Sequence, residues 1–207
     1  SQMPKPGYLE GVRALADKYG CVLIFDEIRS GFRCAMGGAQ ALFGVTPDLT
    51  TIGKAMANGY AIAALVGKRE YMKVLEKDVF LSSTFFPNSD AQVAALKTIE
   101  ILQRDKMLDV LAAKGNNFAQ QVEKVVADSG IPARFSGAPW MPFITFPRDE
   151  AGLYKKLRTE FYTQLIRRGV FLQPYHHGYI CYRHTDEDLA YTVQAIKDSL
   201  GELKSIV

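Results

Sequence analysis

The sequence predicts an α/β fold, with a mostly parallel sheet in its first half and a smaller α+β unit after it. One observation is a helical pattern that ends at Gly20 and leads directly into an apolar run over residues 21–25, a length typical of a buried strand. A helix followed by a buried strand is the repeating pattern of parallel α/β sheets. The other observation is a change beyond Gly130, where short strand-like runs alternate with helical patterns. We therefore expect two domains, at residues 1–95 and 96–207.

The first domain is expected to contain one early helix and three short strands. Apolar residues at helical spacing predict a helix over residues 7–19. The continuous apolar run at 21–25 predicts a strand that is buried on both faces. Residues 29–48 have no clear period and predict an irregular loop, and further short strands are expected at 49–52 and 62–66.

The second domain is introduced by two long helical patterns. Ser89 and Gln92 have the spacing of a capping box, which predicts a helix that begins at Ser89. A second helical stretch over residues 107–127 contains Gly115, where the helix could break. Later elements are expected to be short strands near 135, 143–146, 171 and 180, a helix over 152–168, and a last helix that Thr185 and Asp188 cap.

Composition excludes several classes of function. The chain has 207 residues, 48% hydrophobic and 23% charged, with a net charge of +3, and its basic residues are scattered, so nucleic acid is not an expected partner. No apolar run approaches the roughly 20 residues that cross a bilayer, and the start does not resemble a signal peptide. We therefore expect no membrane partner and a cytoplasmic location. Three cysteines without CxxC spacing and only three histidines predict neither a disulfide framework nor a metal site.

Two residues at predicted strand ends are candidates for chemistry. In open parallel sheets, ligands bind beyond the carboxyl ends of the strands. Asp26 follows the first strand, where it could hold a proton on a heteroaromatic nitrogen, or could simply cap a turn or pair with Arg29. Lys54 follows the second strand among small residues, where burial would lower its pKa and leave a nucleophilic amine, although a surface lysine is the plainer interpretation.

Thr84 is a third candidate, ahead of the helix expected from Ser89. Hydroxyls and backbone N–H groups at the start of a helix suit a phosphate. The alternative interpretation is a set of turn and capping residues without a ligand. Spacing alone does not decide between the two.

Five segments resemble the class III aminotransferases, which belong to fold type I of the pyridoxal-phosphate (PLP) enzymes. Three of them lie in the family's order and at its separations, namely LIFDEI at 23–28, SGFR at 30–33 and GVTPDLTTIGK at 44–54. The other two, GGAQ at 37–40 and HTDED at 184–188, are closest to the glutamate-1-semialdehyde aminomutase branch. The resemblance covers effectively the whole chain, which is similar to the C-terminal half of a family member. It implies part of a large domain, whose mostly parallel sheet has helices on both faces, and a C-terminal α+β small domain.

The resemblance also implies a cofactor, pyridoxal 5'-phosphate, and a role for each candidate residue. Asp26 would hold the protonated pyridine nitrogen, Ile28 would lie against the ring, and Lys54 would carry the cofactor as a Schiff base and then move protons. Thr84 matches a residue that reaches the cofactor phosphate of the other subunit in a homodimer. The implied function is transfer of an amino group between an amine or amino acid and a carbonyl compound.

Departures from the aminomutase branch leave alternatives open. His176 takes the position of that branch's glutamate, and residues 58–61 replace a glycine-rich segment, which argues against true semialdehyde mutase activity. His176 and His177 could contact substrate or could be an exposed pair in a loop. An aminomutase, a decarboxylase or a racemase uses the same cofactor, and a catalytically inert fragment or homologue is the alternative from another class.

Overall fold

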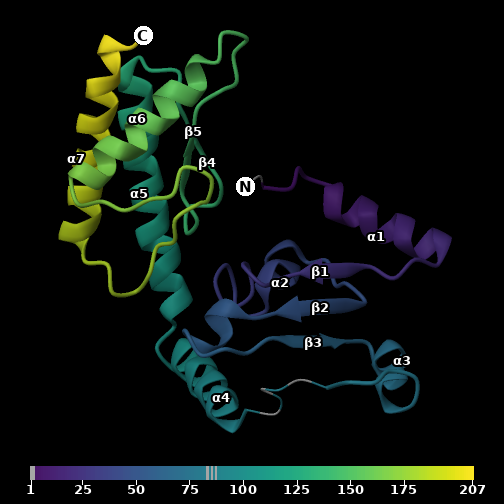
Figure 1. Cartoon of the computed structure of the whole chain (residues 1–207). Coiled ribbons are helices and arrows are strands. Elements are labelled where there is room, and N and C mark those ends of the chain that lie inside the picture. The colour runs from purple at the N-terminus through teal and green to yellow at the C-terminus, as the bar shows by residue number, and fades with distance from the viewer. Residues whose placement is uncertain (1–2, 83, 85, 87) are drawn as a thin grey trace. The chain divides into compact units, whose positions relative to one another are not determined.

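The computed structural model describes residues 3–82, 84, 86 and 88–207. It divides into two compact units (Figure 1), which we call the sheet unit, residues 4–108, and the helical unit, residues 109–207 with Met3. The boundary expected near residue 95 falls inside a helix. A division into a cofactor-binding domain and a small domain stays a prediction.

The sheet unit is built on three strands in the order β1-β2-β3. Strand β1 (Ile24–Asp26) runs parallel to β2 (Leu49–Ile52), and β3 (Ala64–Gly67) runs antiparallel to β2. Residues 27–48 are long enough for the crossover that parallel pairing requires, whereas residues 53–63 are not. The strand predicted at 49–52 is confirmed. The third strand begins later than predicted. Because it pairs antiparallel with β2, only one of the two strand pairs in this described sheet is parallel.

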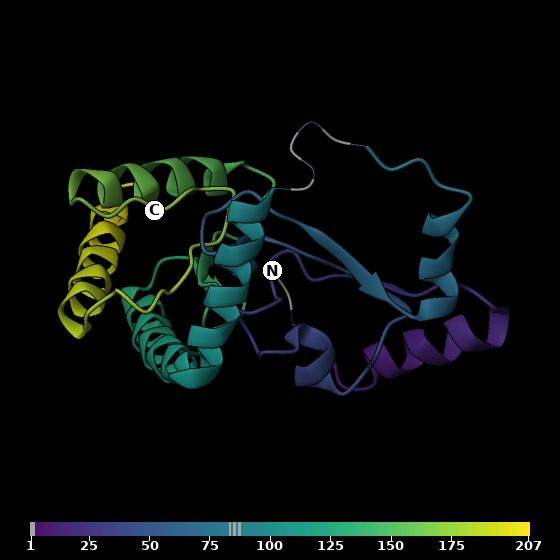
Figure 2. The same cartoon turned by 90° about the horizontal axis from the view of Figure 1, so that it is seen from below.

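Two helices lie on one face of this sheet (Figure 2). Helix α1 (Tyr8–Tyr19) ends as predicted, with Gly20 in the left-handed region at φ 65°. Helix α2 (Gly38–Phe43) occupies part of the segment predicted to be an irregular loop, so that prediction was wrong. Arg13 of α1 bonds Asp48, and Gln40 of α2 bonds Thr50, and both partners point to the same side because side chains alternate along a strand.

The opposite face of the sheet is open. Ile24 of β1 is 53% exposed and Leu65 of β3 is 45% exposed. The prediction of a first strand buried on both faces was therefore wrong for this chain, and β1 is shorter than the apolar run. The reason is that α1 and α2 cover one side only. The helices that the resemblance places on both faces are found on one face within the described residues.

The sheet unit ends with α3 (Arg69–Met72) and α4 (Ser89–Arg104). Helix α4 begins at Ser89 as predicted, but Asn88 is its N-cap, with Oδ1 accepting from Asp90 N at 3.0 Å. The predicted capping box of Ser89 and Gln92 was therefore wrong, because the Asn88 side chain caps this helix. Inside the unit, α4 lies on the 3-10 helix η1 (Lys54–Ala57), and Ala95 of α4 packs in one cluster with Met56 and Ala57 of η1.

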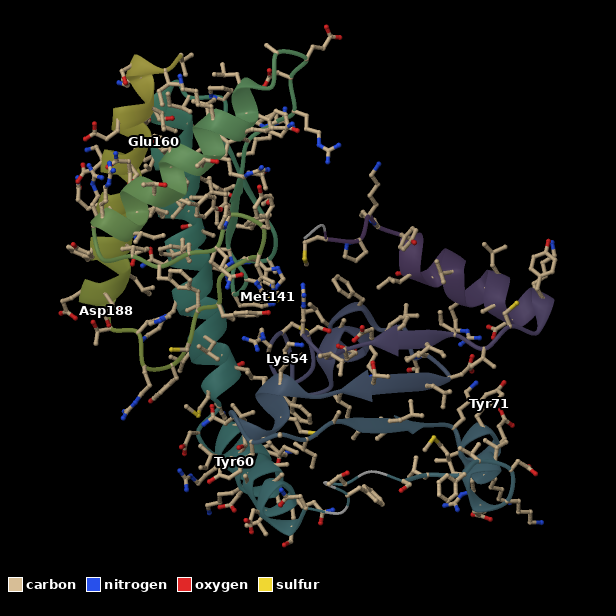
Figure 3. The ribbon with its side chains drawn as sticks, viewed as in Figure 1. Lys54, Tyr60, Tyr71, Met141, Glu160 and Asp188 are labelled. Atoms are coloured by element: carbon tan, nitrogen blue, oxygen red, sulfur yellow. The ribbon has the colours of Figure 1, made fainter. Side chains whose placement is uncertain are left out.

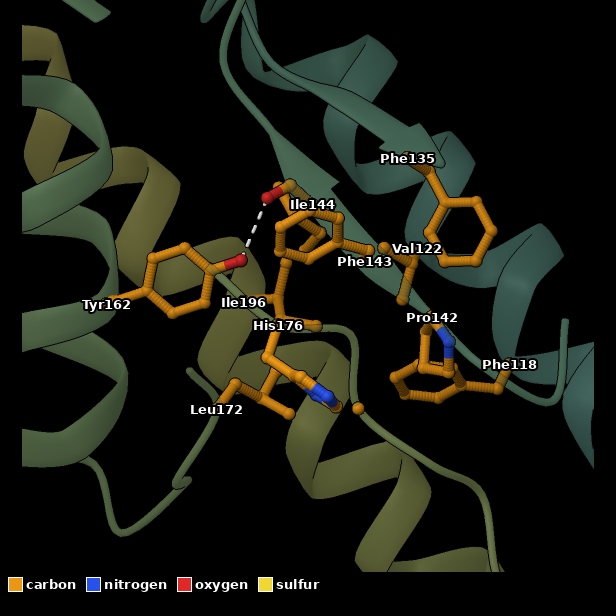
Figure 4. Close-up of a pocket in the computed structure, with 11 residues that line it drawn as sticks. Phe118, Val122, Phe135, Pro142, Phe143, Ile144, Tyr162, Leu172, His176 and Ile196 are labelled. Atoms are coloured by element: carbon orange, nitrogen blue, oxygen red, sulfur yellow. Dashed lines mark hydrogen bonds between the residues drawn. The ribbon is translucent and has the colours of Figure 1, made fainter. Parts of the chain in front are cut away.

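The helical unit combines α5 (Met107–Ser129), α6 (Leu153–Arg167) and α7 (Asp186–Glu202) with a hairpin of β4 (Arg134–Ser136) and β5 (Phe143–Thr145). Apolar side chains from every one of these elements form its core, including Phe161, Leu165 and Leu200, each 0% exposed. Figure 4 shows part of this core, where Tyr162 Oη donates to Ile144 O at 2.8 Å. No helix among the described residues has the length and apolar character needed to span a membrane.

Two details of the helical unit differ from the sequence prediction. Helix α5 continues through Gly115. A glycine is needed at this position because a Cβ there would lie 3.0 Å from Pro139 C. The strands expected near residues 171 and 180 are absent from the described structure. Two isolated backbone bonds join that segment to the residues before β5, Gly178 N to Pro142 O at 2.8 Å and Ile180 N to Trp140 O at 3.1 Å. The capping box at the start of α7, formed by Thr185 and Asp188, is confirmed.

Candidate active site

Asp26 and Lys54 follow neighbouring strands at the same edge of the sheet. Asp26 is the last residue of β1, and Lys54 comes two residues after β2 ends at Ile52 (Figure 3). The parallel register pairs Asp26 with Thr51. The structure thus brings a carboxylate and a lysine to adjacent carboxyl ends of two parallel strands, the place where ligands bind in open α/β sheets.

The Asp26 carboxylate is exposed on the open face of the sheet. Its Oδ1 accepts hydrogen bonds from Ile28 N at 3.0 Å and from Thr51 Oγ1 at 3.3 Å. No donor among the described residues bonds Oδ2. The bond from Ile28 N caps the turn after β1, as the alternative interpretation of Asp26 expected, and no ion pair between Asp26 and Arg29 is found among the described residues.

Lys54 has an unusual backbone conformation for a lysine. Its φ of 45° lies in the left-handed region, and it begins the 3-10 helix η1. Residues held in this region by their surroundings are concentrated at functional sites. The side chain is exposed in this chain, so the described residues do not supply the burial that was expected at this position.

Ile28 lies beside the glycine that precedes Lys54. A Cβ built on Gly53 would stand 3.3 Å from Ile28 Cδ1 and 3.4 Å from Ile62 O. Gly53 therefore lets the two strand ends approach closely. Ile28, Lys54 and Asp26 are thereby gathered at one edge of one unit.

Glu27 is a buried residue of this edge that sequence reasoning missed. It is 1% exposed, and its carboxylate accepts from Ser30 Oγ at 2.5 Å, Ala39 N at 2.7 Å and Gln40 N at 2.9 Å. Glu27 thus provides hydrogen-bond acceptors for the first N–H groups of α2, although it precedes Ala39 by twelve residues in the sequence. Alternation along the strand was the signal available, because Asp26 and Glu27 must point to opposite faces.

A second buried carboxylate, Asp48, marks the opposite end of β2 and lies outside the candidate site. It is 2% exposed and accepts from Lys68 Nζ at 2.6 Å, Leu23 N at 2.7 Å and Arg13 Nη1 at 3.0 Å. The Lys68 ammonium, the Leu23 N–H and the Arg13 guanidinium hold the pKa of this carboxyl well below its usual range. Through these three partners, Asp48 connects α1, the residue before β1 and the residue after β3.

Thr84 and the histidine pair are the remaining residues that the sequence analysis singled out. Thr84 is exposed in a turn between two positions that the structure does not describe. His176 and His177 belong to the helical unit, with stacked rings 4.5 Å apart. His177 is 7% exposed and its Nε2 lies 3.1 Å from Tyr179 Oη, so the alternative of an exposed pair was wrong. His176 lies at the margin of the apolar core (Figure 4).

Comparison with known proteins identifies the family. The family model described as Aminotransferase class-III matches residues 1–205. The chain belongs to the class III aminotransferases. The α/β fold type I and the resemblance inferred from the motifs are thereby confirmed.

Two relatives differ in the reaction that their names give. A 3-aminobutyryl-CoA aminotransferase of Cloacimonas acidaminovorans (strain Evry) is 76% identical over 100% of this chain and 50% of its own length. A glutamate-1-semialdehyde 2,1-aminomutase of Desulfovibrio desulfuricans is 37% identical over 94% of this chain and 48% of its own length. The chain therefore spans about half the length of the curated relatives it matches. The identities favour an aminotransferase over the aminomutase branch.

Solved structures agree with this fold. The FumI protein of Sphingopyxis sp. MTA144, in its PLP internal aldimine form, is 26% identical with a TM-score of 0.86 over 96% of this chain and 47% of its own. An omega-transaminase of Sphaerobacter thermophilus is 28% identical with a TM-score of 0.86 over 97% of this chain and 48% of its own. The family and the PLP-bound neighbour indicate pyridoxal phosphate as the cofactor.

Proposed function

We propose that this chain is part of a PLP-dependent aminotransferase that moves an amino group between an amine or amino acid and a carbonyl compound. The observation that carries the proposal is the placement of Asp26 and Lys54 at neighbouring strand ends, with one Asp26 oxygen left without a donor in the described structure. This donor set suits the cofactor, because a pyridine nitrogen needs an anion and an aldehyde needs an amine.

When bound, pyridoxal phosphate supplies an electron sink for the charge that develops on the substrate carbon. Asp26 would keep a proton on the ring nitrogen through Oδ2, which favours that sink. Ile28, which lies beside Gly53, would contact one face of the ring. These residues bind and orient the ring without taking part in proton transfer to substrate.

Lys54 has two roles in this proposal. Its Nζ would hold the cofactor covalently, and as a free amine it would take a proton from the substrate carbon and return it to C4′ of the cofactor. The short helix η1 begins at Lys54 and buries its own Met56 and Ala57, which fixes the backbone that carries the lysine side chain. Burial of the amine would come from segments outside this chain.

The substrate class follows from the most similar of the named relatives above. That relative is named for 3-aminobutyryl-CoA, and it shares 76% of its aligned residues with this chain. We propose a 3-amino acyl thioester as amino donor. A 2,1-aminomutase reaction is the second candidate, supported by the 37% identity to such an enzyme, and it would need no external amino acceptor.

A homodimer with active sites at the interface is part of the proposal. The sheet unit leaves large apolar side chains exposed near Thr84, including Phe80 at 93% and Leu81 and Phe86 at 61% each. Exposed apolar surface of this kind favours a protein interface. Thr84 would then reach the cofactor phosphate of the other subunit.

The experiment that tests the function uses the full-length protein. Purified holoenzyme should show a visible absorbance band that borohydride removes, and 3-aminobutyryl-CoA with a 2-oxo acid should give an amino acid product. Lys54→Ala should lose the band and all turnover, whereas the exposed Lys73→Ala should keep both. A wild-type protein without the band would refute the cofactor assignment, and turnover without any acceptor would favour the mutase.

The role of Asp26 has its own test. Asp26→Asn should retain bound cofactor and lose about 100-fold or more of kcat, because an amide does not favour the protonated ring. Asp78→Asn, an exposed acid in the same unit, is the control and should be active. Full activity of Asp26→Asn would show that this carboxylate does not hold the ring nitrogen.

A further inference from the structure

The two oxygens of Asp26 are not equivalent. Oδ1 receives both protein hydrogen bonds, from Ile28 N at 3.0 Å and from Thr51 Oγ1 at 3.3 Å. Oδ2 receives none from the described residues. The carboxylate is therefore anchored through one oxygen and presents the other to whatever binds on the open face of the sheet.

Thr51 is held firmly by the strand ladder. It lies opposite Asp26 in the parallel pair, and its carbonyl accepts from Glu27 N at 2.9 Å. On its other side it pairs with Leu65 of β3. A β-branched side chain has a restricted χ1, so this backbone position also restricts the hydroxyl. The hydroxyl proton can only be donated in this contact, because an ionised carboxylate only accepts.

The two hydrogen bonds to Oδ1 restrict the rotation of the Asp26 carboxylate. Rotation of the carboxylate about its last bond is broad and roughly two-fold, so an unrestrained Asp26 would sample many orientations. The Ile28 N–H holds Oδ1 from along its own chain, and the Thr51 hydroxyl holds it from the next strand. Two donors from different directions define the plane of the carboxylate better than one.

We propose that Thr51 is a positioning residue for the cofactor, whose hydroxyl, together with the Ile28 N–H, holds Asp26 Oδ1 so that Oδ2 faces the pyridine nitrogen. The inference rests on the proposed function, since it assumes that Asp26 meets the ring nitrogen. It adds a residue that does not touch the cofactor. At 3.3 Å the contact is longer than most O–H···O bonds, so the expected effect is modest.

The test compares Thr51→Val with Thr51→Ser in the full-length holoenzyme. Valine keeps the branched shape and loses the hydroxyl, and serine keeps the hydroxyl. Thr51→Val should weaken PLP affinity of the apoenzyme by about 3- to 10-fold, and Thr51→Ser should stay within about 2-fold of wild type. With ¹⁵N-labelled PLP, the ring nitrogen of Thr51→Val should lose its proton at a lower pH than in wild type.

A double-mutant cycle separates this role from a general effect on the strand. In an Asp26→Ala background, which removes the acceptor, Thr51→Val should cause no further loss of PLP affinity, because its effect passes through the carboxylate. An unchanged PLP affinity and ¹⁵N titration in Thr51→Val would overturn the proposal, as would an equal loss in both backgrounds. If Thr51→Val does not fold, a Thr51→Ser titration that departs from wild type despite its hydroxyl would also overturn it. Failure of the proposed function is distinct, because wild type itself would then bind no PLP.

Discussion

The helical unit and the sheet unit are stabilised in different ways. The helical unit has a closed apolar core in which Phe161, Leu165 and Leu200 are 0% exposed. In the sheet unit the buried apolar cluster is small, and Glu27 and Asp48 are among its most buried large side chains. One unit buries a large apolar core, whereas the other buries a small apolar cluster and two hydrogen-bonded carboxylates.

The two units differ in how much of their apolar surface their own elements cover. Apolar burial is the main favourable contribution to folding, and the helical unit obtains it from its own elements. The sheet unit leaves Ile24, Leu65 and Leu96 in contact with solvent, with Leu96 71% exposed. Its candidate site lies on this open face. We expect the sheet unit to need cover from other segments or from a second subunit, as an active site between partners requires.

The sharpest way to break this comparison is to separate the units. Residues 109–207 expressed alone should give a dispersed amide NMR spectrum and a cooperative thermal transition. Residues 4–108 alone should give a poorly dispersed amide NMR spectrum or should aggregate, because this unit buries too little apolar surface. The whole chain serves as the reference for both. A well-dispersed spectrum from residues 4–108 would show that its polar contacts suffice.

A core substitution tests the helical unit itself. Phe161 contacts the rings of Phe146 and Tyr162 at centroid distances of 5.6 and 5.1 Å. Phe161→Ala should lower the free energy of unfolding by about 3–5 kcal/mol, because it leaves a cavity in a closed core. Ile166→Ala, at an exposed position of the same helix, should cost under about 0.5 kcal/mol. Denaturant titration measures both, and similar costs would contradict a closed core.

Acid should act on the sheet unit through Asp48. Its folded-state pKa lies below the usual value, so its contribution to stability is present above the unfolded pKa of about 4 and is lost as pH falls below it. At pH 7, Asp48→Asn should lower the thermal midpoint by several degrees. The gap in thermal midpoint between Asp48→Asn and wild type should narrow as the pH falls from about 4 to about 2. A gap that stays constant over this range would refute the linkage, and the exposed Asp78→Asn is the control.

The smallest expected effect is on thiol reactivity. Burial raises the pKa of the half-buried Cys34 thiol to about 11, whereas Cys21 and Cys181 are exposed. Iodoacetamide at pH 8 should modify Cys34 about 10- to 100-fold more slowly than the other two cysteines. Mass spectrometry of timed digests gives the three rates. Equal rates would show that the loop after β1 is open in solution.

Local sequence patterns were sufficient for most of the helices and for the central strand. The end of α1 at Gly20, the strand at 49–52 and the capping box of α7 depend on residues within a few positions of one another. The order of motifs also placed Asp26 and Lys54 at strand ends. Their catalytic roles stay predictions.

Other features depended on partners far apart in the chain. Helix α2 was missed because the Glu27 carboxylate that bonds its first N–H groups precedes it by twelve residues. Gly115 suggested a break, but it is there to let Pro139 approach an unbroken helix. Thr51 was not a candidate until the parallel register set it opposite Asp26.

The sequence by itself determined most of the long helices, where the central strand lies and which carboxylate and lysine lie at the ends of neighbouring strands. Only the tertiary structure decided that one face of the sheet is open, that Asp26 is anchored through a single oxygen, and that Glu27 and Asp48 tie the unit together. The physical reason is that propensities and caps act over a few residues. Strand register, side-chain contacts and burial are set by groups that meet only after folding.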